Sequence, residues 1–243
     1  MIDDPHPLPE AQPLEPSAVP QQPVSGPAKS PAREWLETIV WALAIALVLR
    51  FFVIQAFTIP SGSMEDTLLV GDFLLAEKIT KHFHDPVPGD IVIFQHPNPQ
   101  DGVKRDLIKR CVATAGMTVE VRNKDLYING VLKPIPTEGK HIDPNTYPAT
   151  SNRRDNFGPV TVPPGNLFVM GDNRDNSDDS SFWGFMPLTH LKARPMILYW
   201  SWNPDPGAPP LSWNPMSWMF SLGYNITHFF QRVRWARIGH VIR

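Results

Sequence analysis

The chain has 243 residues and a formal net charge of −2, so no excess of positive charge argues for nucleic acid as a partner. Its single cysteine, Cys111, excludes an internal disulfide. No group of Cys and His has the spacing of a zinc site, and we therefore expect neither a metal nor another cofactor.

Residues 1–32 are rich in Pro, Ala, Gln and Ser and contain almost no large apolar side chains. Such a segment cannot bury enough apolar surface to order itself. We predict a disordered tail.

The next segment, residues 33–57, is predicted to be a transmembrane helix. The apolar run from Trp35 to Phe57 is long enough for a bilayer core, which needs about 20 residues. A cleaved signal peptide fits less well, because the preceding arm is long and mildly acidic and no small-x-small site follows cleanly. A buried core helix also fits less well, because residues 39–49 are apolar all round.

The flanking charges predict the orientation of this helix. Lys29 and Arg33 precede the span, and no positive charge follows Arg50 until Lys78. Positive charge gathers on the cytoplasmic side of a membrane. We therefore expect a cytoplasmic N-terminus and an extracytoplasmic domain over residues 58–243.

Residues 58–243 show short apolar or alternating runs separated by turn residues, which is typical of a mostly antiparallel β fold with little helix. The predicted strands lie at residues 72–79, 91–94, 104–112, 118–122, 166–170 and 193–202, with a hairpin over 125–132 that turns at Asn129-Gly130. Residues 133–160 are polar and contain prolines, so we expect a long surface excursion there.

The segment after Trp202 is aromatic but too polar for a second span. One interpretation is a loop that packs on the domain. The other is an aromatic surface that enters the membrane interface. The aromatic residues concerned are Trp213, Trp218, Phe220, Phe229 and Phe230.

A candidate nucleophile follows the apolar segment. Ser63 lies on a turn shaped by Pro60 and Gly62, and a serine hydroxyl needs a base to take its proton. No Gly-x-Ser-x-Gly elbow is present, and three available histidines have no recognisable local setting. They are His96, His141 and His190.

Lys109 is a candidate base, because it lies in an apolar run with Leu107-Ile108 before it and Cys111-Val112 after it. A lysine serves as a base only if burial lowers its pKa from about 10.4. Residues 171–179 form a third unusual segment, which alone is consistent with an acidic turn or with a calcium loop that lacks the Gly and Glu of an EF-hand.

Taken alone, the turn with Ser63 is explained by a linker after the membrane span, and Lys109-Arg110 is explained by a pair of solvated charges on a strand. The occurrence of all three segments in one chain favours a catalytic site.

The combination resembles the bacterial type I signal peptidases. The segment Pro60-Ser-Gly-Ser-Met-x-x-Thr-Leu-x-x-Gly-Asp72 resembles the family's nucleophile segment, and Lys109-Arg110 resembles its lysine segment. The run Gly171-Asp-Asn-Arg-Asp-Asn-Ser-x-Asp-Ser180, followed by Trp183-Gly184, resembles the third signature. Order and spacing agree over residues 35–202, and residues 232–239 resemble the family's C-terminus.

The resemblance implies a mostly β, antiparallel catalytic domain behind one N-terminal transmembrane helix. It implies an endopeptidase that cleaves signal peptides after an Ala-x-Ala site, with Ser63 as nucleophile and Lys109 as general base. The Ser63 amide and the Ser61 hydroxyl would form the oxyanion hole, Ser177 would orient the lysine, and Asp179 would support the site. The small substrate pockets would be lined by Ile59, Met64, Leu68, Leu107 and Ile108.

The resemblance also implies secretory preproteins and membrane lipid as partners, and a monomer in the bacterial cytoplasmic (inner) membrane with the catalytic domain outside. Two alternatives stay open. One is a specialised paralogue with a restricted substrate, and the other is a catalytically silent, membrane-anchored binding module. Intact Ser63, Lys109 and Ser177 argue against silence, and a covalent serine probe separates the two.

Three departures from the family pattern bear on the geometry of the site. The usual Gly-Leu-Pro-Gly-Asp after the lysine segment is replaced by residues 113–117, Ala-Thr-Ala-Gly-Met. Asp66 stands where a proline is common. Ser181 stands where an arginine usually partners the supporting aspartate, so we expect Asp179 to lack its ion pair.

Overall fold

The computed structural model describes residues 30–97, 102–210 and 213–242. The chain divides into two compact units, Met1–Ala44 and Ile45–Arg243. Residues 1–29 of the predicted tail lie outside the described residues.

The predicted apolar helix is present as α1, Pro31–Val48, and continues through a π-helical turn, Leu49–Val53. None of its residues is buried, although its exposed side chains include Trp35 and Trp41. A core helix of a soluble domain would bury one face. Its 23 residues have the length and composition to cross a membrane.

The helix ends four residues before the predicted boundary at 57. Residues Ile54–Thr58 form strand β1, which pairs antiparallel with β2, Asp72–Glu77. The pairing gives the backbone of these residues hydrogen-bond partners in the sheet, and Phe57 packs against a buried core cluster. Sheet pairing overrides an apolar run that reads as continuous helix.

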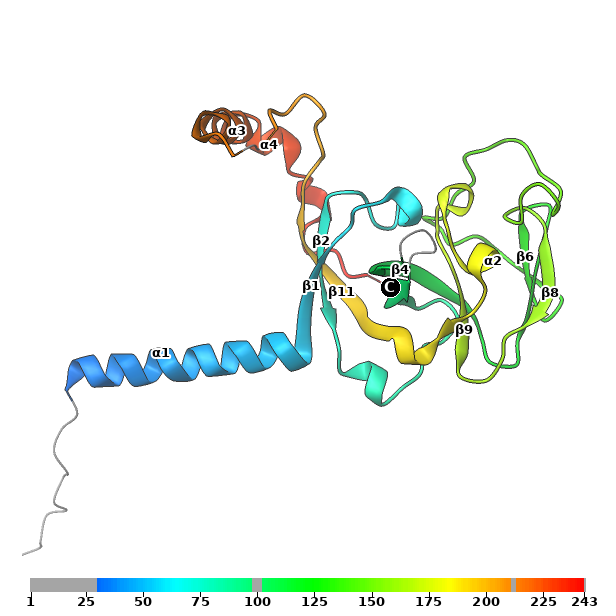
Figure 1. Cartoon of the computed structure of the whole chain (residues 1–243), viewed down its shortest axis with the longest axis horizontal. Helices are drawn as coiled ribbons and strands as arrows, with labels where there is room; N and C mark the ends of the chain where they lie inside the picture. Colours follow the sequence, from blue (N-terminus) through cyan, green and yellow to red (C-terminus); the bar gives the residue numbers. More distant parts are fainter. Residues whose placement is uncertain (1–29, 98–101, 211–212, 243) are drawn as a thin grey trace, which may run out of the picture. The chain divides into compact units, whose positions relative to one another are not determined.

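The described residues of the second unit form two antiparallel sheets (Figure 1). A seven-stranded sheet has the order β1-β2-β11-β3-β4-β9-β10, and a four-stranded sheet has the order β7-β6-β5-β8. The prediction of a mostly antiparallel β domain is confirmed. The remaining strands are β3 (Ile91–Pro97), β4 (Lys104–Thr114), β5 (Thr118–Arg122), β6 (Asp125–Ile128), β7 (Val131–Lys133), β8 (Phe157–Thr161), β9 (Asn166–Met170), β10 (Met186–Pro187) and β11 (Leu191–Ser201).

Each predicted strand and the hairpin correspond to observed strands, with boundaries shifted by a few residues. The hairpin turns where expected, and Asn129 and Gly130 have φ values of 52° and 77°. A two-residue type I′ turn needs positive φ at both positions, and Asn-Gly tolerates it. The polar excursion ends earlier than predicted, because Phe157 begins β8 and pairs with Val121 of β5.

The C-terminal region forms helices rather than a loop. These are α3, Pro215–Thr227, and α4, Phe229–Arg232. The side chain of Asn214 accepts a hydrogen bond from the Met216 amide at 3.0 Å, and Pro215 begins the helix. Asn at the N-cap followed by Pro in the first turn is a standard helix start, which the sequence analysis missed.

Strand β4 positions the chemistry. Residues 104–110 pair with β3, and residues 110–114 pair with β9. Successive side chains of a strand point to opposite faces. Lys109 and Arg110 therefore face opposite sides of the sheet, and they line two different cavities.

Candidate active site

Ser63 lies in a single 3₁₀ turn, Gly62–Met64, which follows β1. The Asn173 amide donates to the Ser63 carbonyl at 3.1 Å, and the Asn173 side chain donates to the Gly62 carbonyl at 3.1 Å. The third segment therefore holds the turn that carries the candidate nucleophile.

Lys109 is only 3 % exposed. Burial lowers its pKa because a charged ammonium loses its hydration, whereas the negative charges of Asp179, Asp178 and Asp172 act in the opposite direction and only partly offset this effect. The desolvation predicted from the apolar neighbours of Lys109 is present.

Ser63 and Lys109 line the same cavity, which has a volume of about 610 Å³. Its walls come from β1, the turn that carries Ser63 and β4. The exposed Ser61 and the predicted pocket residues Ile59, Leu107 and Ile108 also line it. The structure thus brings together most of the residues that the sequence analysis singled out.

Two of the predicted pocket residues lie elsewhere. Met64 and Leu68 are fully buried and belong to the same core cluster as Ile59. Neither lines the cavity that contains Ser63 and Lys109. They support the wall of the cavity by packing behind it.

Gly171 brings Ser177 next to the nucleophile segment. A methyl group added at Gly171 would lie 2.4 Å from the Ser177 hydroxyl oxygen and 2.5 Å from the Ser63 carbonyl oxygen. A side chain at position 171 would therefore displace both serines. The Ser177 hydroxyl is buried and has no hydrogen-bond partner among the described residues.

Asp179 is held by hydrogen bonds. Its carboxylate accepts from the Gly171 amide at 3.1 Å, from the Ser181 amide at 3.1 Å and from the Ser181 hydroxyl at 2.8 Å. Ser181 lies in helix α2, Ser180–Trp183, which Asp179 caps. The serine that replaces the expected arginine therefore satisfies the carboxylate without supplying a charge.

Asp172 joins all three segments, a role that the sequence analysis did not assign. Its fully buried carboxylate accepts from Arg110 Nε at 2.8 Å, from Arg110 Nη2 at 2.7 Å and from the Thr67 hydroxyl at 2.7 Å. A bidentate arginine–carboxylate pair fixes geometry as well as charge. Asp172 lies in the third signature, but nothing in the sequence showed which residues it would contact.

The backbone explains one departure from the family pattern. Asp66 has a φ of 76°, which proline cannot adopt because its ring holds φ near −65°. The Asp66 carboxylate pairs with Lys140 at 3.0 Å. The turn after Ser63 therefore has a conformation of its own, held by an ion pair at its surface.

The three histidines are placed away from Ser63. His141 contacts the Asp175 carboxylate at 2.9 Å through Nδ1, but its buried Nε2 has no hydrogen-bond partner in the described part of the chain. His96 packs on Trp183 with ring centroids 4.2 Å apart, and burial lowers its pKa. Neither these two nor His190 lines the cavity that contains Ser63.

The described residues hold no metal-binding cluster and no ionised thiol. Within residues 30–97, 102–210 and 213–242, no group of three or more His, Cys, Asp or Glu side chains is placed to hold a metal ion. Burial raises the pKa of the Cys111 thiol to about 12, so the thiol stays protonated.

Comparison with known proteins identifies relatives of the chain. Residues 32–200 match the family model described as "Signal peptidase, peptidase S26". A "Probable signal peptidase I-1" of Synechocystis sp. is 42% identical over 211 residues, which cover 85% of this chain and 87% of the relative. A signal peptidase I of Leptolyngbya laminosa is 37% identical over 214 residues, covering 84% and 96%. A signal peptidase I of Pseudomonas aeruginosa is 32% identical over 206 residues, covering 68% and 70%.

Proposed function

Since this chain belongs to the signal peptidase family S26 and is a serine peptidase whose substrates are preproteins with signal peptides, we propose that Ser63 is its nucleophile and Lys109 its general base. The observation that carries the proposal is the shared cavity, which is lined both by a buried lysine with a lowered pKa and by a serine on a tight turn. A neutral amine can take the serine proton, whereas an ammonium cannot.

The reaction follows from these two groups. The Lys109 amine takes the Ser63 proton as the Ser63 oxygen attacks the scissile carbonyl. The resulting ammonium protonates the leaving amine, which yields an acyl-enzyme. Lys109 then takes a proton from water, the hydroxide attacks the ester, and the Lys109 ammonium returns the proton to the Ser63 oxygen as the signal peptide is released. The buried Ser177 hydroxyl, which lacks a partner among the described residues, is available to hold the lysine in place.

The oxyanion is assigned to donors at the start of the turn. Ser63 is the second residue of the 3₁₀ turn, so its amide precedes the first hydrogen bond within the turn, from Glu65 to Gly62. The exposed Ser61 hydroxyl lines the same cavity. One such donor contributes about 3 kcal/mol of transition-state stabilisation.

The substrate chain is expected to bind as an extended strand. Among the described strands, β1 pairs only with β2, so its other edge is free. Residues 104–109 of β4 pair with β3 on one side, and β9 begins to pair only at Arg110. Both free edges line the cavity. A peptide placed there gains main-chain hydrogen bonds, as in β-strand addition.

The walls of the cavity support the proposed preference for small substrate side chains. Ile59, Leu107 and Ile108 fill the space next to Ser63 and Lys109 with branched apolar groups. Larger substrate side chains would overfill such pockets. This supports cleavage after Ala-x-Ala.

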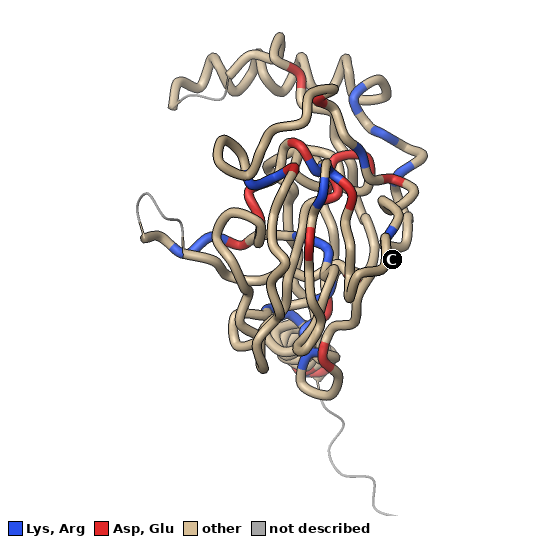
Figure 2. Tube along the Cα trace, turned by 90° about the vertical axis from the view of Figure 1, so that its right-hand side faces the viewer, with Lys and Arg blue, Asp and Glu red and all other residues tan. Residues whose placement is uncertain are grey.

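Membrane attachment is assigned to two surfaces. Helix α1 is the candidate anchor, with Arg33 on the cytoplasmic side of the membrane and the peptidase domain on the other. Helix α3 has no charged residue and is drawn in tan throughout in Figure 2. Its exposed apolar residues and those beside it form an aromatic surface suited to the membrane interface. This surface comprises Trp213, Met216, Trp218, Met219, Phe220, Leu222, Ile226 and Phe230.

Cleavage of a preprotein by the detergent-solubilised full chain tests the assignment. Wild type should cut after the second alanine of an Ala-x-Ala leader, and Ser63→Ala and Lys109→Ala should each abolish cleavage without a change in fold. Ser151→Ala and Lys104→Ala are matched controls, since both residues are exposed and lie outside the cavity. Both controls should retain activity.

Each other outcome points to a different account. Cleavage by Ser63→Ala would refute the nucleophile assignment. Labelling of Ser63 by a serine-directed probe without cleavage would indicate a restricted substrate. No labelling and no cleavage by folded wild type would indicate a silent binding module.

A further inference from the structure

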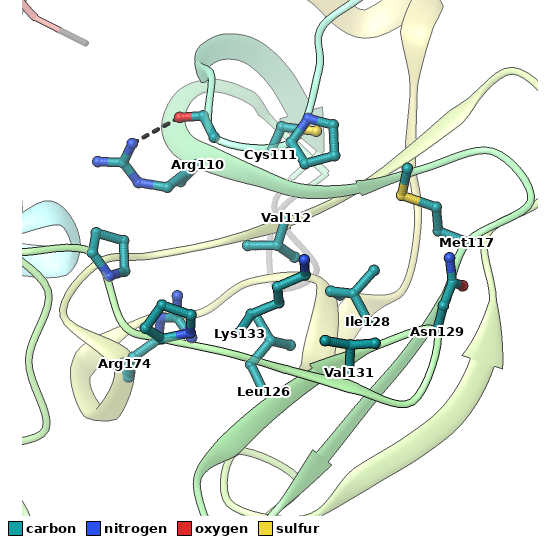
Figure 3. Close-up of a pocket in the computed structure, with 14 residues that line it drawn as sticks. Arg110, Cys111, Val112, Met117, Leu126, Ile128, Asn129, Val131, Lys133 and Arg174 are labelled. Atoms are coloured by element: carbon teal, nitrogen blue, oxygen red, sulfur yellow. Dashed lines mark hydrogen bonds between the residues drawn. The ribbon is translucent and has the colours of Figure 1, made fainter.

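A second cavity lies on the face of β4 opposite to Lys109. It has a volume of about 460 Å³, within the range of about 300–1,000 Å³ for small-molecule sites. Figure 3 shows Arg110 and Arg174 toward one end of it, Ile128 and Val131 toward the other, and Val112 and Lys133 between them. Neither Ser63 nor Lys109 lines it.

The charged end of the cavity contains one satisfied and one unsatisfied guanidinium. Arg110 is paired with Asp172 and donates to the Gly89 carbonyl at 2.7 Å. Arg174 is 4 % exposed, and its Nε has no hydrogen-bond partner in the described part of the chain. Arg174 also forms no ion pair with a carboxylate among the described residues. The carboxylate of Asp172 already accepts hydrogen bonds from Arg110 and Thr67. The carboxylate of Asp179 accepts hydrogen bonds from Gly171 and Ser181.

A buried cation without a hydrogen-bonded partner is costly, because the charge has lost its hydration, and the negative charges of Asp172 and Asp179 offset this loss only in part. The lowered pKa of Arg174 reflects the same burial. An anion that enters the cavity from solvent would supply the missing partner. A guanidinium binds a carboxylate through two parallel hydrogen bonds.

The remaining walls define the rest of the ligand. Val112, Leu126 and Ile128 are buried apolar residues that line the cavity beside Met117 and Val131. Lys133 also lines the cavity, but it is exposed to solvent, so Arg174 is the buried cation there without an ion-pair partner among the described residues. One such guanidinium, with the negative charge of Asp172 nearby, favours a monoanion over a dianion.

We propose that this cavity binds a small monocarboxylate with a short apolar chain, its carboxylate on Arg174 and its chain against Val112, Leu126 and Ile128. The site is separate from the cavity that contains Ser63 and Lys109, and the proposal does not depend on the assignment of these two residues. Binding there would stabilise the buried guanidinium.

Calorimetric titration of the full chain in a non-ionic detergent tests the proposal with hexanoate as the probe. Hexanol has a similar chain without the charge, and inorganic phosphate has charge without the chain. Hexanoate should bind at least tenfold more tightly than either one. Equal binding of hexanol, or no binding of hexanoate, would overturn the proposal.

Two variants locate the site. Arg174→Met should weaken hexanoate binding at least tenfold, whereas Arg153→Met removes an exposed arginine outside the cavity and should leave it unchanged. Ile128→Trp fills the apolar end and should abolish binding while Arg174 is intact. Wild-type affinity for hexanoate in either Arg174→Met or Ile128→Trp would contradict the proposed location.

Discussion

Replacing Gly171 by alanine tests whether the close contact between the third segment and the nucleophile turn aligns the site. The added methyl group would lie 2.4 Å from the Ser177 hydroxyl oxygen and 2.5 Å from the Ser63 carbonyl oxygen, whereas ordinary contact begins at 3.4 Å. The neighbours must therefore move by about 1 Å. Gly171 does not have a positive φ, so the effect comes from crowding and not from backbone strain.

A displacement of about 1 Å in a catalytic site costs about 10²-fold in rate. We expect kcat/KM to fall by about that factor, which corresponds to about 2.7 kcal/mol of lost transition-state stabilisation. Overpacking should also lower the free energy of unfolding by about 1–3 kcal/mol. The assay is cleavage of a fluorogenic peptide with an Ala-x-Ala leader end by the detergent-solubilised full chain, with a parallel thermal melt.

Gly223→Ala is the matched control. Gly223 lies in α3, and an added methyl group there would meet no atom within 4 Å. This variant should keep wild-type kcat/KM. If Gly171→Ala also retained kcat/KM within threefold of wild type, the contact would not align the site, and the reasoning from Gly171 would be refuted.

Three further substitutions probe the charges and the thiol. Asp179→Asn removes a carboxylate that raises the pKa of Lys109, so this pKa should fall and Lys109 should become neutral at lower pH. The acid limb of kcat/KM should therefore move to lower pH. An unmoved limb would argue against Lys109 as the titrating group. Asp172→Asn breaks the buried pair with Arg110 and should lower the free energy of unfolding in urea by about 3–5 kcal/mol; a loss below about 1 kcal/mol would contradict its role in joining the segments. Cys111→Ser should keep wild-type kcat/KM, because a thiol with a pKa of about 12 stays protonated, and a large loss would give Cys111 a chemical role.

Local sequence patterns were sufficient for most of the fold. Alternation and turn residues predicted the strands, and Asn129-Gly130 predicted the hairpin turn, because these signals act over a few residues. The end of the apolar helix was misplaced, since pairing with β2 decides that residues 54–58 form a strand. The start of α3 had a readable signal in Asn214-Pro215, which the aromatic character of the region obscured.

The candidate site was predicted as a set of residues but not as a network. Ser63, Lys109 and Ser177 were chosen from motif and chemistry. Asp172 contacts Arg110 and Thr67, residues 62 and 105 positions away along the chain, and only the folded sheet brings them together. The unpartnered guanidinium of Arg174 is likewise a product of burial that no local pattern encodes.

The pH dependence of kcat/KM tests the central claim most directly, since Lys109 must be neutral to act as a base. Wild type should show an acid limb at a pH well below 10.4, the ordinary pKa of lysine, because burial lowers the pKa of Lys109. Lys109→Met should show no activity at any pH. An acid limb near pH 6.5 that persists in Lys109→Met would assign the base to a histidine and contradict the Ser63/Lys109 account.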